Sequence, residues 1–272
     1  MKNTTFSVLC SLYHKESPVF LDNCLESIEK QSLAPSEVVI VHDGPLTQPL
    51  YKILDKWRKK LPIVELKLDQ NVGLGEALNK GLALCKHDLI VRVDTDDINM
   101  SNRFYEQVSF MLEHPDIAVS SCHIEEFDKC PSKPTGLREV PIDNIRKISL
   151  KKNPINHMAC IFRKEVVVAS GGYKHLMFME DYYLWLRIIA NEHQIKNLNK
   201  VLVKARAGDA MLSRRRGFTY TKSEFKLMRK IYKIGLTKNP FYLFYFSVRG
   251  VARLLPARAL QIIYKKNRKY IR

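Results

Sequence analysis

The sequence predicts an α/β fold, in which a mostly parallel mixed sheet is flanked by helices and followed by a basic helical extension. Over the first hundred residues, short apolar runs typical of buried strands alternate with segments whose apolar residues recur at a helical period. Strands separated by helices favour parallel pairing with right-handed crossovers. Beyond about residue 218 the pattern changes to helices that are rich in cationic and aromatic side chains.

The predicted elements follow one another in a regular order. Strands are expected over six apolar segments, at residues 6–12, 37–42, 63–68, 87–93, 117–122 and 157–163. Helices are expected at residues 19–31, 50–61, 74–85, 103–114 and 182–192. Residues 126–156 are rich in Pro, Lys and Asp, and they predict a loop or a short helical excursion.

The positive charge of the chain is concentrated at its C-terminal end. Of 45 Lys and Arg residues, 20 lie in residues 198–272 beside only two of the 28 acids, so this segment carries +18 and the rest −1. We predict two parts, residues 1–217 and residues 218–272. The aromatic and cationic second part predicts docking on an anionic membrane surface. The alternatives are packing against a partner helix and binding to nucleic acid, and nothing else in the chain supports nucleic acid.

The cysteines and the apolar runs indicate where the protein works. Six cysteines are scattered without a CxxC pair and without a signal peptide, which is typical of free thiols in a reducing cytoplasm. The apolar runs near the C-terminus are much shorter than the ~20 residues that a membrane span needs. We therefore expect a cytoplasmic protein that is peripheral on the inner face of the cell membrane.

The most informative motif is Asp94-Thr95-Asp96-Asp97, which follows the apolar run at residues 89–93. Three carboxylates on one loop need a cation to offset their repulsion, and hard oxygen ligands suit Mg²⁺ or Mn²⁺ held together with phosphates. We predict Asp94, Asp96 and Asp97 as metal ligands. The alternative is an ordinary acidic turn before the next helix. An EF-hand is excluded because the Gly and Glu that its loop requires are missing.

Five motifs, taken in order, resemble the family 2 glycosyltransferases with the GT-A fold. They are SVLCSLY at residues 7–13, VIVHDG at 39–44, NVGLGEALNKG at 71–81, DTDD at 94–97 and EDYYLWLR at 180–187. Each motif alone is a modest signal, and the ordered set makes the resemblance specific. It covers roughly residues 4–215 and implies a Rossmann-like sheet of the kind predicted above.

The resemblance implies a binding site for a nucleotide sugar at the carboxyl ends of the strands. Ser11 and Tyr13 would flank the nucleotide, and Asp43 would accept a hydrogen bond from uracil or ribose. Asn71 and Gly73 would let the backbone close over the nucleoside, although a plain helix-entry turn is the alternative. Asp94 would contact the ribose as well as the metal ion.

The resemblance also implies a catalytic pair at the start of the helix at residues 182–192. Asp181 would be the general base that deprotonates the acceptor hydroxyl, and Glu180 would position the acceptor. Which of the two takes the proton stays open. An acidic first turn that is favoured by the helix dipole is the structural alternative. His157 would contact phosphate or acceptor, or it is a core histidine.

Three arginines late in the first part complete the predicted site. Arg206, Arg214 and Arg215 resemble a basic loop that closes over the pyrophosphate, and Arg214 and Arg215 are also suited to the phosphates of a lipid-linked acceptor. A solvated run of charges is the alternative for each of them.

Together these features predict an inverting glycosyltransferase that depends on Mn²⁺ or Mg²⁺. It would move a hexose from UDP-glucose or UDP-galactose to a sugar on undecaprenyl pyrophosphate, in O-antigen or exopolysaccharide synthesis. One alternative is a nucleotidyltransferase, but the chain lacks the Gly-rich phosphate loop expected near its N-terminus. The other is a non-catalytic module that binds nucleotide sugars or membranes.

Overall fold

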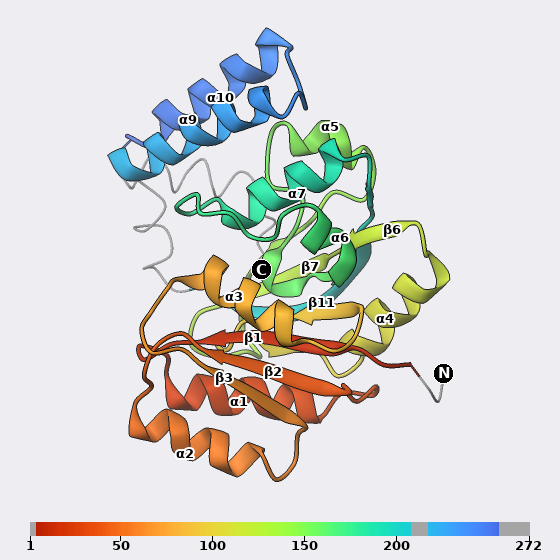
Figure 1. Cartoon of the computed structure of the whole chain (residues 1–272), viewed down its shortest axis with the longest axis vertical. Helices are drawn as coiled ribbons and strands as arrows, with labels where there is room; N and C mark the ends of the chain where they lie inside the picture. Colours follow the sequence, from red (N-terminus) through yellow and green to blue (C-terminus); the bar gives the residue numbers. More distant parts are fainter. Residues whose placement is uncertain (1–3, 208–216, 256–272) are drawn as a thin grey trace.

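The computed structural model describes residues 4–207 and 217–255, and it shows a central sheet between layers of helices (Figure 1). The sheet has seven strands in the order β10-β6-β9-β4-β1-β2-β3. They are β1 (Ser7–Leu12), β2 (Glu37–His42), β3 (Ile63–Lys67), β4 (Leu89–Arg92), β6 (Ile117–Ser120), β9 (Ile161–Arg163) and β10 (Gln194–Ile195). All pairs are parallel except those made by β9, which confirms the predicted mixed sheet.

The helices that the apolar period predicts cover both faces of this sheet. One face is buried by α1 (Pro18–Glu29), α2 (Gln48–Trp57) and α4 (Arg103–Glu113). The other is buried by α3 (Leu74–Leu84), α6 (Lys164–Ala169) and α7 (Glu180–Ala190). Trp185 of α7 is fully buried in the cluster that this helix forms with the sheet. The six cysteines are free thiols, as predicted, and all except Cys130 are buried.

A second sheet was not predicted. It has the order β5-β11-β7-β8 and consists of β5 (Ile98–Asn99), β7 (Cys122–Phe127), β8 (Pro134–Arg138) and β11 (Leu198–Arg206). The loop expected at residues 126–156 is therefore only partly correct, although α5 (Ile145–Ser149) is the short helical excursion. β8 contains Pro134 and Gly136, which disfavour strands, and its pairing with β7 overrides that local preference.

The strand expected at residues 157–163 is also shorter than predicted. Its first half is a 3₁₀ turn, η1 (His157–Ala159), and only β9 pairs with the sheet. The turn is closed by the backbone N–H of Ala159, which donates to the carbonyl of Asn156 at 2.9 Å. His157 therefore lies outside the sheet ladder.

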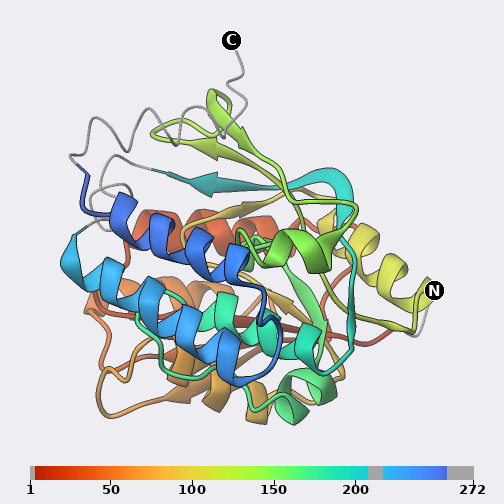
Figure 2. The same ribbon diagram turned by 90° about the horizontal axis from the view of Figure 1, so that it is seen from above.

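Two C-terminal helices form a hairpin that packs over α7. They are α9 (Phe218–Lys233) and α10 (Pro240–Ala252). Both figures show them side by side, at the top of the molecule in Figure 1 and in front in Figure 2, which is the view from above. Leu227, Ile231 and Phe246 from the hairpin share one buried cluster with Tyr182 and Leu186 of α7. The predicted helical extension is thus present, and its inner face is part of the core. The division of the chain at residue 217 stays a prediction.

Candidate active site

Three strands deliver polar side chains to one edge of the main sheet. β1 pairs in parallel with both β2 and β4, so the carboxyl ends of the three strands meet. Ser11 lies near the end of β1 and Tyr13 just beyond it, while Asp43 follows β2 and Asp94 follows β4. Ligands bind at such edges in open α/β sheets. The structure therefore brings these four predicted residues to the same edge.

Asp43 holds the loop that precedes α3. Its Oδ1 accepts a hydrogen bond from the backbone N–H of Val72 at 2.6 Å, and its Oδ2 accepts from Asn71 Nδ2 at 2.9 Å and from the backbone N–H of Gly73 at 3.2 Å. The neighbouring Gly44 has φ +86°, and a Cβ there would lie 2.8 Å from the backbone nitrogen of Asn71. Asp43 thus fixes the shape of the loop, and its predicted contact with the nucleoside stays a prediction.

The three aspartates after β4 form one cluster. Asp94, Asp96 and Asp97 each offer a carboxylate oxygen, and these atoms lie within 4.8 Å of one another. The guanidinium of the buried Arg92 forms an ion pair with Asp94. Asp97 accepts a hydrogen bond from the backbone N–H of Arg206 at 2.8 Å, which ties the cluster to the end of β11.

The electrostatics of this cluster fit a divalent cation. Burial, and then the charges of Asp94 and Glu16, raise the pKa of Asp96 to about 7. Burial and the charges of Asp96 and Asp94 raise the pKa of Asp97 well above its ordinary value. Carboxylates that resist ionisation beside one another are stabilised by a bound cation, and three hard oxygen donors suit Mg²⁺ or Mn²⁺. The residues present therefore fit the predicted metal ion.

Sequence reasoning missed two residues of this half of the site. Glu16, in the loop after β1, accepts a hydrogen bond from Thr95 Oγ1 at 3.0 Å and so connects that loop to the acidic tetrad. Arg92 belongs to the apolar run at residues 89–93, and its charge inside a buried strand is the only feature of the sequence that points to it. A charged residue in such a strand needs a partner, and this rule would have indicated Asp94.

The predicted catalytic pair opens α7. Glu180 and Asp181 form its first helical positions, where carboxylates are favoured by the helix dipole. α3 approaches closely here, since a Cβ on Gly75 would lie 3.4 Å from Glu180 Cγ. Burial raises the pKa of Glu180. The start of α3 follows the predicted nucleoside loop. It therefore meets the start of α7 at the site.

Asn153 fixes the orientation of Asp181. Its Nδ2 donates to Asp181 Oδ2 at 2.8 Å, and its Oδ1 accepts from the backbone N–H of Ile155 at 3.2 Å. Because the backbone N–H can only donate, the amide oxygen must face Ile155 and the amide N–H must face the carboxylate. Sequence reasoning missed Asn153, since an Asn before Pro is an ordinary turn signal.

His157 and Tyr173 link the two halves of the site. His157 Nε2 lies 2.8 Å from the hydroxyl of Tyr173. Burial, and then the charge of Arg92, lower the pKa of His157 well below its ordinary value, so this ring is neutral near pH 7. Burial raises the pKa of Tyr173, and the carboxylates of Asp181 and Asp94 both add to that shift. Tyr173 therefore lies within electrostatic reach of the predicted base and of the acidic cluster.

The side chain of Arg206 is engaged with aromatic rings. Its guanidinium carbon lies 3.6 Å from the ring centroid of Phe20 and 4.7 Å from that of Phe127, which are cation–π distances. Its backbone contacts the acidic cluster, while its predicted role toward the nucleotide sugar stays a prediction. Arg214 and Arg215 lie outside the described residues.

Comparison with known sequences supports the ordered motifs. The profile of Glycosyl transferase family 2 matches residues 7–168. The amylovoran biosynthesis glycosyltransferase AmsE of Erwinia amylovora is 43% identical over 268 residues, which cover 97% of this chain and 99% of the relative. The UDP-Gal:alpha-D-GlcNAc-diphosphoundecaprenol beta-1,3-galactosyltransferase of Escherichia coli is 40% identical over 262 residues, which cover 96% of this chain and 95% of the relative.

Comparison with solved structures supports the fold. TarS 1-349 of S. aureus in complex with UDP-GlcNAc superposes with a TM-score of 0.68 at 21% identity, covering 92% of this chain and 72% of the other. The mannosyltransferase PcManGT of Pyrobaculum calidifontis, in complex with GDP-Man and Mn²⁺, gives a TM-score of 0.64 at 17% identity over 96% of this chain and 79% of the other. The chain therefore has the GT-A fold.

Proposed function

We propose, since this chain belongs to glycosyl transferase family 2, that it transfers a hexose from a UDP-sugar to a sugar carried on a lipid diphosphate. The observation that carries the proposal is the end-to-end similarity to the Escherichia coli enzyme, whose name specifies UDP-Gal as donor and GlcNAc-diphosphoundecaprenol as acceptor. Of the two predicted donors, UDP-glucose and UDP-galactose, this similarity favours UDP-galactose. The amylovoran relative supports a place in exopolysaccharide or O-antigen synthesis.

The proposed reaction is a direct displacement at the anomeric carbon. The acceptor hydroxyl forms the new bond to this carbon while the bond to UDP breaks on the opposite side, so the configuration is inverted. The hydroxyl proton passes to the carboxylate of Asp181, which acts as the general base. Asn153 orients that carboxylate at 2.8 Å, and Glu180 beside it positions the acceptor. UDP takes the electron pair of the broken bond.

The acidic cluster supports metal dependence. Asp94, Asp96 and Asp97 would hold Mn²⁺ or Mg²⁺, which when bound neutralises charge on the leaving diphosphate. The loop at residues 71–73, fixed by Asp43, would cover the nucleoside. Arg92 stays beneath Asp94 and offsets part of the cluster's negative charge.

The first test is nucleotide binding followed by transfer. Thermal shifts with UDP, GDP, CMP and ADP, each with and without Mn²⁺, should show stabilisation by UDP that needs the metal ion. Asp96→Ala should abolish that dependence, whereas Asp116→Ala, an exposed acid outside the site, should not. Asp181→Asn should abolish transfer and leave UDP–Mn²⁺ binding intact, and a larger loss in Glu180→Gln would move the base to Glu180. Transfer without any metal ion would contradict the proposed dependence.

The donor is tested by competition between its two candidates. Purified protein receives UDP-galactose or UDP-glucose with GlcNAc-diphosphate-lipid as acceptor, and kcat/KM is compared. Galactose transfer that exceeds glucose transfer by about a hundredfold would support the proposed specificity. Equal use of the two sugars would leave the enzyme a hexosyltransferase of broader specificity.

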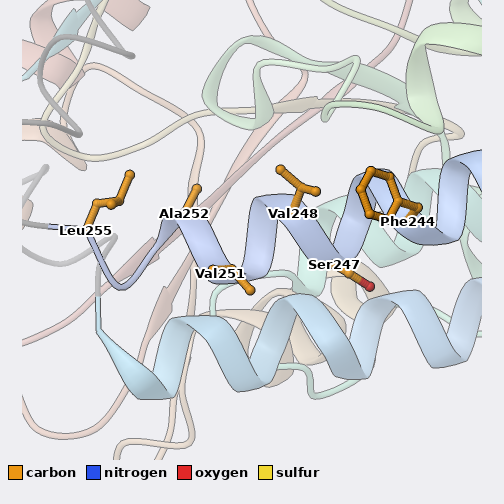
Figure 3. A pocket seen from close by; sticks show the side chains of 6 residues that line it. All are labelled: Phe244, Ser247, Val248, Val251, Ala252 and Leu255. Carbon is orange, nitrogen blue, oxygen red and sulfur yellow. The ribbon is translucent and has the colours of Figure 1, made fainter.

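We also propose that the enzyme works on the inner face of the cell membrane, held to an anionic surface by α10. One face of this helix carries exposed apolar side chains at helical spacing, namely Phe241, Phe244, Val248 and Val251, and the exposed Leu255 follows the helix. All of these except Phe241 line a pocket (Figure 3). Glu224 is the only acid in residues 218–255, which favours anionic lipid. Among the residues that the structure describes, no helix is long and apolar enough to cross a membrane.

Vesicle sedimentation tests this association. Phe244→Ser with Val248→Ser should reduce binding to vesicles containing an anionic lipid, whereas Leu112→Gln, an exposed apolar position on α4, should bind as the wild type does. Deletion of residues 241–272 is a poorer test, because it removes the buried Phe246 from the cluster with α7. Undiminished sedimentation of the double variant would contradict the role of α10.

A further inference from the structure

Two exposed apolar side chains lie in the loop just before the catalytic pair. Met177 and Phe178 are 46% and 45% exposed, while their neighbours Leu176 and Met179 are buried. These two side chains therefore point out of the protein immediately before Glu180. Two neighbouring large apolar side chains that stay about half exposed beside a polar site indicate a surface that binds something apolar.

The backbone at Phe178 makes this exposure more informative. Phe178 has φ +68°, the left-handed conformation that bulky side chains rarely adopt and that Asn or Gly adopt most readily. The chain thus keeps an aromatic ring at a position where backbone preference favours a small polar residue. Residues held in this region cluster at ligand sites, where the surrounding structure enforces them.

The ring of Phe178 also connects the site to the C-terminal hairpin. It stacks on Tyr220 of α9, with ring centroids 5.1 Å apart and planes at 15°. The guanidinium of Arg253, at the end of α10, lies 4.5 Å from the centroid of Tyr220. The loop before α7 therefore contacts the start of the hairpin through the ring of Phe178.

We propose that Met177 and Phe178 bind the hydrocarbon chain of the lipid-linked acceptor where it leaves the diphosphate. This inference rests on the proposed function. The reacting hydroxyl must lie at Asp181, and the hydrocarbon begins only one sugar and two phosphates away from it. Met177 and Phe178, just before this helix, offer exposed apolar surface and no hydrogen-bonding group, which matches the hydrocarbon. The hydrocarbon would then run toward the hairpin, which Phe178 contacts through Tyr220.

The test compares two acceptors that share one sugar diphosphate and differ only in their lipid. One carries a long isoprenoid chain and the other a short alkyl chain. Phe178→Asn removes the ring and its stacking on Tyr220, and the preference of Asn for the left-handed backbone offsets that loss, so the variant should fold with a Tm close to that of the wild type. We expect it to raise the KM of the long-chain acceptor about tenfold, with the KM of the UDP-sugar and the kinetics of the short-chain acceptor within twofold of wild type. Phe178→Tyr, which keeps the ring, and Leu112→Gln should match the wild type.

Three other results would overturn the inference, and each can be told from the others. Unchanged KM for the long-chain acceptor in Phe178→Asn and in Met177→Ser would remove these side chains from lipid binding, while the proposed function stands. An equal loss on both acceptors would mean that Phe178 only supports the catalytic pair. If the wild type used no lipid-linked acceptor, the proposed function would fail first, and the inference with it.

Discussion

Replacement of Asn153 by Ala removes a hydrogen bond that orients the proposed base. Asn153 Nδ2 lies 2.8 Å from Asp181 Oδ2, and the amide is locked by the backbone N–H of Ile155 at 3.2 Å. A hydrogen bond donated to an ionised carboxylate both orients it and favours its charged form. We therefore expect a slower chemical step in Asn153→Ala and an acidic limb of the pH–rate profile that moves to higher pH.

The size of the effect follows from the type of bond. Hydrogen bonds to charged groups contribute about 1.5–3 kcal/mol. Since about 1.4 kcal/mol corresponds to one pH unit, the limb should move by about one unit. The kcat near pH 7 should fall roughly tenfold or more, because the carboxylate is no longer held in one orientation. The KM of the UDP-sugar should stay within about twofold, because Asn153 contacts the proposed base.

The assay is the initial rate of transfer between pH 5 and 9 at saturating donor, with UDP binding measured separately. Asn153→Asp, which places a second carboxylate against Asp181, should show a larger shift of the limb in the same direction. Asn191→Ala, at the opposite end of α7, is the matched control and should behave as the wild type. The reasoning is refuted if Asn153→Ala keeps a kcat within twofold of wild type and an unmoved limb.

Three further predictions concern the supports of the site. His157 has a pKa lowered well below 6.5 in the folded protein, so the unfolded chain binds the extra proton and stability falls by about 1.4 kcal/mol per unit as the pH drops below 6.5. His157→Gln should flatten this acid-side loss in urea unfolding measured at pH 7 and 5.5, and parallel curves would contradict it. Glu224→Gln should lower the free energy of unfolding by roughly 3 kcal/mol. The fully buried Glu224 pairs with Arg249 at 2.8 Å, and the substitution removes the carboxylate charge from that buried pair. A change below about 1 kcal/mol would show that the pair is dispensable. Gly44→Ala should weaken UDP binding about tenfold, because the added Cβ overlaps the nucleoside loop and strains the backbone by roughly 1–3 kcal/mol. Gly235→Ala is the control. It has a positive φ but no atom within 4 Å of the added Cβ, so it should lose some stability and no UDP affinity.

The sequence determined the parts of the fold that depend on local burial. Apolar runs and helical periods predicted β1 to β4 and the helices between them, because each pattern reflects which faces of a short segment avoid water. Parallel order then placed Tyr13, Asp43 and Asp94 at one edge, and the structure confirms this placement. The acidic tetrad was visible because three carboxylates in four residues are chemically conspicuous without any knowledge of the fold.

Only the tertiary structure decided which distant residues support that chemistry. Asn153 reaches Asp181 across 28 positions, and Glu16 reaches Thr95 across 79. Such contacts arise from packing between elements that no local pattern specifies, and their residue types are common in ordinary turns. The second sheet was missed for the same reason, since β8 gains from pairing with β7 what its own residues lack. The stacking of Phe178 on Tyr220 likewise arises only because α9 packs over α7. The sequence alone gives no sign that these elements meet.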